Sequence, residues 1–275
     1  MEISSELVLL ASGLLVAGFV AGIIAGLLGV GGGIVLVPVL FQTFVFFDLP
    51  PHLQIHMAVA TSLAIICFTG FQSARSHLKR GAVDVMVLRD WGMFVAIGAL
   101  SGAIAARFIA PVGLKLVFAA IALGAGLRML ISRDGGEGRA HPLALGMQKC
   151  LSLLIGLFSA LMGIGGGTLS VPLLGMSGRD MHRAVGTSSA IGVIIAVPAT
   201  LGFILAGWNL TDLPPLSLGY VNVLALGLMI PTSMLGAPLG ARMAHQLSRP
   251  TLNYVFAGFL LISAGRMLAS LFGVG

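Results

Sequence analysis

The sequence predicts an all-α polytopic membrane protein made of two inverted repeats, each a broken-helix hairpin followed by three transmembrane helices. Three observations carry this prediction: long apolar runs, motifs shared by the two halves, and an uneven distribution of basic residues. Hydrophobic residues make up 57% of the 275-residue chain and charged residues only 9%, with a mean hydropathy of +1.07. Soluble domains carry about 25% charged residues. The composition therefore excludes a soluble domain, and we expect a lipid bilayer around the protein and no nucleic-acid partner.

Eight segments are free or nearly free of charge. They cover residues 7–47, 53–74, 91–106, 108–127, 150–178, 184–211, 213–241 and 250–265. A spanning helix needs about 20 apolar residues, and most of these segments approach or exceed that length. Glu2 and Glu6 precede the first segment in place of the basic residues that open a signal peptide, so we expect this segment to stay in the membrane.

The second half of the chain repeats the motifs of the first half in the same order. The sequence Gly-Val-Gly-Gly-Gly at 29–33 returns 134 positions later as Gly-Ile-Gly-Gly-Gly at 163–167. Further matches follow in register: Val37-Pro38 with Val171-Pro172, 58–62 with 184–188, Arg107 with Arg242, 117–119 with 255–257, and 128–130 with 266–268. This pattern indicates a duplication. We expect a first repeat at 1–132, a cytoplasmic linker at 133–145 and a second repeat at 146–275.

The basic residues distinguish two ways of threading the repeats. If residues 7–47 and 150–178 each cross once, the repeats are parallel and the more basic side holds nine of the fifteen Lys and Arg residues. If each segment is a hairpin, the repeats are inverted and the cytoplasmic side holds twelve, with Arg107, Lys115 and Arg266 outside. Cytoplasmic loops are enriched in Lys and Arg. The hairpin arrangement is therefore favoured, with both termini outside.

The glycine clusters form the first part of a candidate site. Successive glycines destabilise a helix by about 1 kcal/mol each relative to Ala, so we expect breaks there, with new helices starting at Ile34 and Thr168. The exposed N–H groups and the positive ends of the new helices then form a concave donor set that suits an anion. Close helix packing is the alternative interpretation, and it is the one we favour for Gly18, Gly22 and Gly26.

Threonine and serine recur at 61–62 and 187–188, about one turn into the next helix of each repeat. Their hydroxyls either donate to a substrate oxygen or bond the carbonyl one turn back. The predicted substrate-binding set comprises Gly31, Gly32, Gly33, Thr61, Ser62, Gly165, Gly166, Gly167, Thr168, Thr187 and Ser188. No catalytic residue, metal ligand or cofactor is expected, since Cys67 and Cys150 lack the spacing of metal ligands or of a disulfide framework.

Carboxylates are absent from the apolar segments, whereas proton- or sodium-coupled cation carriers usually place one in the membrane. This absence argues against a metal or organic-cation transporter. His56 and His182 are expected at membrane boundaries, with proton sensing as the alternative. Arg107 and Arg242 are expected to reach lipid headgroups rather than a substrate. The pattern favours a small anion as the transported molecule.

At the glycine clusters the chain resembles the sulfite exporter TauE/SafE family of membrane proteins. The resemblance rests on the cluster at 29–33 with Val37-Pro38 downstream and on its repetition at 163–167 with Val171-Pro172, and it covers essentially the whole chain. It implies export of sulfur-containing anions such as sulfite, sulfonates or sulfoacetate across the bacterial cytoplasmic (inner) membrane, with alternating access around a midplane site. Which anion is carried, in which direction, whether a proton is coupled, and the oligomeric state stay open.

Other functions compete with this one. A passive anion channel, a transporter of another small organic anion and a non-transporting scaffold fit the same features, and flux measurements separate them. An intramembrane serine protease would need a nucleophile with a base in reach. The sequence Gly-Thr-Ser-Ser at 186–189 lacks the final glycine typical of such proteases. We therefore expect a transporter rather than an enzyme.

Overall fold

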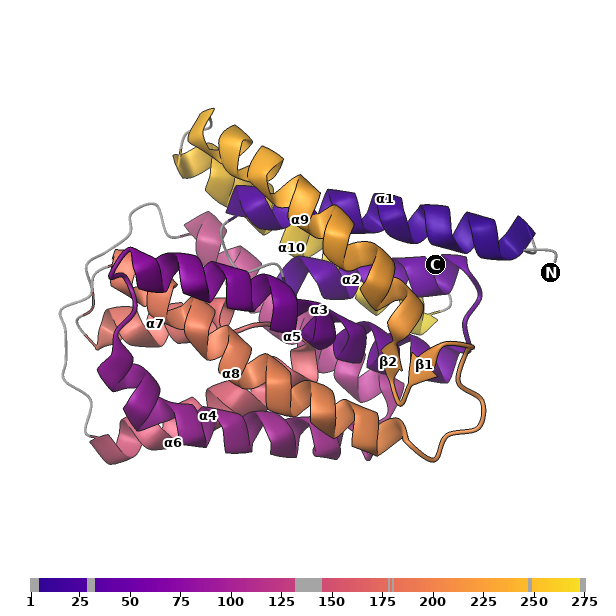
Figure 1. Cartoon of the computed structure of the whole chain (residues 1–275), viewed down its shortest axis with the longest axis horizontal. Helices are drawn as coiled ribbons and strands as arrows, with labels where there is room; N and C mark the ends of the chain where they lie inside the picture. The colour runs from indigo at the N-terminus through magenta and orange to yellow at the C-terminus, as the bar shows by residue number, and fades with distance from the viewer. Residues whose placement is uncertain are drawn as a thin grey trace.

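The structure is a computed structural model that describes residues 5–28, 33–131, 145–177, 179, 181–246 and 249–272. These residues form an almost wholly helical bundle (Figure 1). Its elements are α1 (Ser5–Leu28), α2 (Gly33–Phe46), α3 (Pro51–Lys79), α4 (Val85–Ala106), α5 (Pro111–Ile131), α6 (Leu145–Met162), α7 (Gly167–Met176), α8 (Met181–Gly207), β1 (Ser217–Leu218), β2 (Val221–Asn222), α9 (Val223–Gln246), α10 (Arg249–Ala269) and the 3-10 helix η1 (Ser270–Phe272). Seven described helices are long and apolar enough to span a membrane: α1, α3, α4, α5, α8, α9 and α10. The predicted all-α polytopic membrane fold is confirmed.

Two helices begin earlier than their apolar runs suggest. α3 starts with Pro51, whose fixed φ suits the first helical position. Thr61 therefore lies about three turns into α3, and Thr187 about two turns into α8, so the expectation of one turn is wrong. α4 starts where the Asp84 carboxylate caps it by accepting from two backbone N–H groups, at 3.1 and 3.3 Å. As a result Asp90, which precedes the apolar run, is helical and exposed.

The helices restart at the glycine clusters. α2 begins at Gly33 and α7 at Gly167, each one residue before the predicted start. Between α6 and α7, Gly163 adopts a φ of +69°, a conformation that glycine reaches without steric cost. Residues 29–32 lie outside the described part of the chain. A helix break at the second cluster is therefore confirmed.

Helices of one half pack against helices of the other half. α1 lies along α9 and α6 along α4, while α3 contacts α8 and α5 contacts α10 (Figure 1). A Cβ on Gly22 would lie 2.4 Å from a carbonyl oxygen of α9, and a Cβ on Gly156 would lie 2.1 Å from a carbonyl oxygen of α4. The packing role predicted for Gly18 and Gly22 is confirmed, and the surroundings of Gly26 lie outside the description.

α3 is the buried centre of the bundle, since every residue from Leu53 to Ile66 is buried. The α3–α4 connector (residues 80–84) and the α8–α9 connector (residues 208–222) link the central helices to α4 and α9. The second connector carries β1 and β2, which pair antiparallel. β1, β2 and the start of α1 lie at one end of the bundle, and α7 and the α3–α4 connector lie at the other (Figure 1). We name these the hairpin end and the α7 end.

Candidate functional site

The turn between α6 and α7, residues 163–166, is buried where α2, α3 and α8 meet. The Ser62 hydroxyl on α3 donates to the Gly163 carbonyl oxygen at 2.8 Å. A Cβ on Gly33, the first residue of α2, would lie 2.6 Å from the backbone nitrogen of Gly165. The structure thus places Ser62 and the start of α2 directly against the second glycine cluster.

Neighbouring glycines of this turn meet very different surroundings. A Cβ on Gly166 would lie 2.6 Å from the carbonyl oxygen of Ser188 and 2.8 Å from the backbone nitrogen of Gly192, both on α8. A Cβ on Gly165 would lie 3.4 Å from the Ile66 side chain, an ordinary van der Waals distance. Only glycine fits at 166 without a backbone shift, because α7 begins in direct contact with α8.

The N-terminus of α7 has no side-chain cap. Gly166 occupies the cap position, and no side chain accepts from the first turn. The backbone N–H groups of residues 165–169 donate to no acceptor among the described residues, and the Ser170 N–H is the first to find one, the Gly166 carbonyl at 2.9 Å. The hydroxyls of Thr168 and Ser170 are also buried without a partner in the described chain. Because a helix start carries partial positive charge, these donors form an electropositive site that has no acceptor among the described residues.

The threonines of the predicted set lie against the two connectors. Thr61 Oγ1 accepts from the backbone N–H of Asn222 at 3.0 Å, and Thr187 Oγ1 accepts from that of Asp84 at 2.9 Å. Both threonines are fully buried. Both contacts join the two halves. Thr61, in the first half, binds the residue just before α9, and Thr187, in the second half, binds the residue just before α4. Each hydroxyl is fixed as an acceptor and keeps its own proton for a further bond.

The serines next to them are already used as donors. Ser62 donates to the turn, as described, and Ser188 donates to the carbonyl of Val185, one turn back in α8, at 2.8 Å. Their hydroxyls therefore present only lone pairs to a ligand, which suit an anion poorly. Of the remaining predicted residues, Gly167 is partly buried at the start of α7, and Gly31 and Gly32 lie outside the described residues.

His56 is a buried polar group that lies outside the predicted set. The residue is 4% exposed, so the ring lies within the protein. Nε2 lies 3.0 Å from the carbonyl oxygen of Ala106, Nδ1 is buried without a partner, and the ring stacks on Tyr220 with centroids 5.1 Å apart. The sequence signal was a histidine inside a spanning helix. The side chain of His182 lies outside the description.

Lys115 is also buried, although the charge analysis counts it with the outer loops. It lies on α5 and is 8% exposed. Its Nζ donates to the Ser270 hydroxyl at 3.1 Å and lies 4.9 Å from the centre of the Phe41 ring. A hydroxyl and an aromatic face stabilise the ammonium at this helix end. Lys115 lies inside the apolar run 108–127, and this position is the sequence signal for its burial.

Ionic contacts join elements at both ends of the bundle. At the α7 end, Arg179 Nε donates to Asp84 Oδ2 at 3.1 Å. Burial raises the pKa of Asp84, but the bonds from Arg179 and from the first turn of α4 outweigh it and hold that pKa below its ordinary value. At the hairpin end His52 Nε2 lies 2.5 Å from Asp212 Oδ2, and this hydrogen bond lowers the pKa of Asp212.

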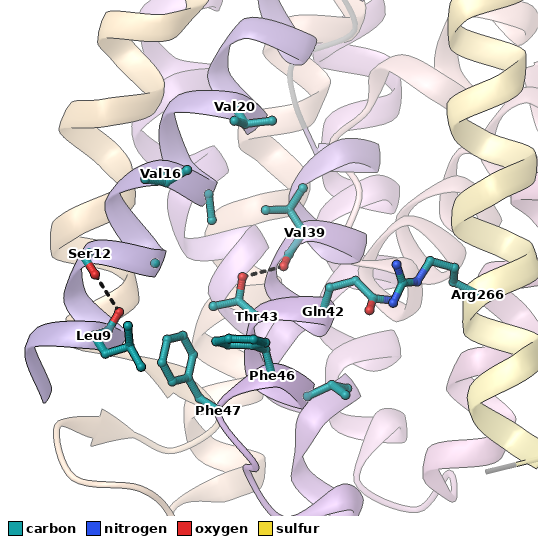
Figure 2. Close-up of a pocket in the computed structure, with 13 residues that line it drawn as sticks. Leu9, Ser12, Val16, Val20, Val39, Gln42, Thr43, Phe46, Phe47 and Arg266 are labelled. Atoms are coloured by element: carbon teal, nitrogen blue, oxygen red, sulfur yellow. Dashed lines mark hydrogen bonds between the residues drawn. The ribbon is translucent and has the colours of Figure 1, made fainter. Parts of the chain in front are cut away.

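A separate cavity of about 760 Å³ opens between α1, α2 and α10 (Figure 2). Most of its walls are apolar, and Figure 2 shows Gln42 and Arg266 pointing toward one another at one side. None of the predicted site residues lines it. We therefore place the candidate site at the start of α7 rather than in this cavity. Among the described residues no three His, Cys, Asp or Glu side chains gather as metal ligands.

Comparison with known proteins places the chain among membrane transporters. The model of the family described as sulfite exporter TauE/SafE matches residues 14–267. A probable membrane transporter protein from Haemophilus influenzae is 32% identical over 254 residues, which cover 92% of this chain and 96% of that protein. Probable membrane transporter proteins from Methanocaldococcus jannaschii and Bacillus subtilis (YunE) are 26% and 24% identical, covering 94% and 90% of this chain and 96% and 94% of their own.

No solved structure matches the chain. The seven apolar helices and these relatives indicate a multi-pass protein of the bacterial cytoplasmic (inner) membrane. A family match that extends over nearly the whole chain includes both glycine clusters and both central helices. The chain therefore belongs to the sulfite exporter TauE/SafE family of membrane transporters.

Proposed function

We propose that the protein exports small sulfur-containing anions of the sulfite, sulfonate or sulfoacetate class, without catalysing a reaction on them. The observation that carries this proposal is the uncapped start of α7, where the N–H groups of residues 165–169 and the hydroxyls of Thr168 and Ser170 lack partners within the described chain. An oxyanion accepts several such bonds at once. The description of the family as sulfite exporters supports both the substrate class and the direction.

Neutral donors suit a carrier, which must release what it binds. Residues 163–170 contain no charged side chain. One hydrogen bond between neutral groups contributes about 0.5–1.5 kcal/mol, so several together give moderate affinity. A fixed arginine would bind the anion more tightly and slow its release. The start of α7 therefore fits reversible binding.

We also propose that residues 1–132 and 146–275 are inverted repeats that rock about this site, and that both glycine clusters line it. Equivalent contacts support the proposal. Thr61 and Thr187 hold opposite connectors by the same bond. Gly22 and Gly156, separated by the same 134 positions as the two glycine clusters, make the same close approach. Rocking of one half against the other would release one connector while the other stays held, which is alternating access.

The proposal is tested with purified protein by thermal shift and by flux into proteoliposomes, using sulfite, sulfoacetate, taurine, sulfate and thiosulfate. We expect sulfite or a sulfonate to stabilise the protein and to be transported at a saturable rate. Thr168→Val should weaken anion binding by about 0.5–1.5 kcal/mol, or roughly 2- to 13-fold, with little loss of stability because its hydroxyl has no described partner.

The matched control is Ser177→Ala, at the other end of α7, because this hydroxyl donates to the Leu173 carbonyl at 2.9 Å. Its anion affinity should equal that of the parent. If no sulfur anion binds, the substrate class is wrong. If Thr168→Val binds as tightly as the parent, the site is not at the start of α7, and flux that does not saturate would indicate a channel.

A further inference from the structure

His56 lies where three contacts join α3 to the α8–α9 connector. His52, His56 and Thr61 contact Asp212, Tyr220 and the backbone of Asn222, in that order along both segments. The first contact is exposed, whereas His56, Tyr220 and Thr61 are buried. The imidazole of His56 is therefore the buried group in this row of contacts whose side-chain type titrates near neutral pH.

The hydrogen bonds of His56 fix which nitrogen carries its proton. A carbonyl oxygen only accepts, so Nε2, at 3.0 Å from the Ala106 oxygen, is the protonated nitrogen of the neutral ring. Nδ1 is then an acceptor, and it is buried with no donor in the described chain. The carbonyls of Ile109 and His52 also lie near the ring. Neither oxygen is bonded to Nδ1 in this arrangement.

Among the described residues, no carboxylate contacts the ring as a partner for an imidazolium. Tyr220 covers one face, with an interplanar angle of 24°. The charged or titratable groups that act on His56 or on its stacked partner Tyr220 are His52 on α3, Arg107 after α4 and Asp212 on the connector. α5, which also packs against α3, carries Lys115, whose ammonium is bonded to Ser270. Asp212 bonds to His52, and Arg107 adds positive charge. A proton on Nδ1 therefore leaves an unpaired buried charge unless water reaches the ring.

We propose that His56 is a proton-binding site whose protonation releases the α8–α9 connector from α3. The proton adds to the Nδ1 lone pair, and the imidazolium gains its missing acceptor from water once Tyr220 moves off the ring. The proposal deepens the proposed transport function and rests on it, because movement of this connector opens the hairpin end. The corresponding contact at the α7 end uses Asp84 and Arg179, so the two ends respond differently to pH.

Cysteine labelling tests the proposal without any substrate. Val221, 3% exposed in β2, and Leu218, 43% exposed in β1, are paired in the same hairpin. Each is replaced by Cys in a chain from which Cys67 and Cys150 have been removed. The rate of labelling by a methanethiosulfonate at 221 is divided by the rate at 218, which cancels the effect of pH on the thiol itself.

We expect this ratio to rise about tenfold from pH 8 to pH 5.5, the change produced when a released imidazole with the ordinary pKa of about 6.5 binds the proton about a hundred times more tightly than the enclosed ring. His56→Gln should abolish the rise, because its amide still donates to the Ala106 carbonyl but takes up no proton. His52→Gln is the matched control and should keep the rise. A flat ratio in the parent, or the same rise in His56→Gln, would overturn the proposal.

A second variant keeps the proposal testable if His56→Gln does not fold. Tyr220→Leu removes the stacked ring, so the ratio at pH 8 should already approach the value that the parent reaches at pH 5.5. An unchanged, low ratio in Tyr220→Leu would count against the proposal. A pH-dependent ratio in a protein that transports no sulfur anion would overturn the proposed substrate and leave the proton site standing.

Discussion

Adjacent glycines in the α6–α7 turn provide a sharp test of how α7 is held. Gly166→Ala places a methyl group 2.6 and 2.8 Å from two backbone atoms of α8, so the helices must shift. Overpacking of this kind costs about 1–3 kcal/mol. Gly165→Ala meets its closest neighbour at 3.4 Å and should change stability by less than about 0.5 kcal/mol.

For chains of about 150–250 residues, 1 kcal/mol shifts the melting temperature by about 2–4 °C. Gly166→Ala should therefore melt roughly 2–12 °C below the parent, and Gly165→Ala within about 2 °C of it. The measurement is thermal unfolding in detergent, with and without the best-bound anion. At 100 times the dissociation constant a ligand adds about 2.7 kcal/mol. Gly165→Ala should keep this gain and Gly166→Ala should lose most of it.

Two results would refute this reasoning. Equal melting temperatures for the two variants would mean that α7 and α8 can move apart to accommodate the methyl group without a loss in the free energy of unfolding. An equal gain from the anion in both variants would mean that displacing the start of α7 does not disturb the binding site.

Three further predictions concern the connectors and the orientation. Thr187→Val leaves the Asp84 N–H unpaired and should cost about 1–3 kcal/mol in thermal unfolding, whereas Ser189→Ala, whose hydroxyl bonds within its own helix, should cost less; equal losses would contradict this. The pKa of Asp84 is lower in the folded protein than the unfolded pKa of about 3.9. The stabilisation from its carboxylate is therefore fully present above the unfolded pKa and is lost as the pH falls through the folded pKa. Asp84→Asn should accordingly show a smaller acid-induced loss of stability than the parent below about pH 4, measured by thermal unfolding. A cysteine that replaces Asp48 should be labelled by a membrane-impermeant reagent from outside, and one that replaces Lys79 from the cytoplasm. Labelling of both positions from one side would rule out the inverted arrangement.

Local features explain what could be predicted from the sequence. The restart at Gly167 follows from glycines that destabilise any helix, and the packing role of Gly22 follows from small residues at four-residue spacing. The start of α4 depends on the cap at Asp84, which a reading of hydropathy overlooks because Arg89 and Asp90 separate the first turn of that helix from the long apolar run. These are effects of residues near one another in the chain.

Rotation of the central helices could not be predicted in the same way. Thr61 and Ser62 are neighbours, yet Thr61 faces the α8–α9 connector and Ser62 faces the α6–α7 turn. Which of the two meets the candidate site depends on how α3 is turned within the bundle, and contacts more than 100 residues apart set that rotation. The missing partner of His56 Nδ1 arises from the same long-range packing.

The pairing of α1 with α9 determines the order in which the protein is assembled. Translation completes α1 at Leu28, but α9, its main partner, begins only at Val223. The contact between α1 and α9 therefore cannot form until most of the chain has been made. The contact between α4 and α6 forms earlier, because α6 is translated soon after α4. The close approach at Gly22 therefore forms late, and a ribosome that stalls before α9 leaves the N-terminal helix without its main partner. The first half made alone should be a target for membrane quality-control proteases, and supplying the second half as a separate chain should rescue it.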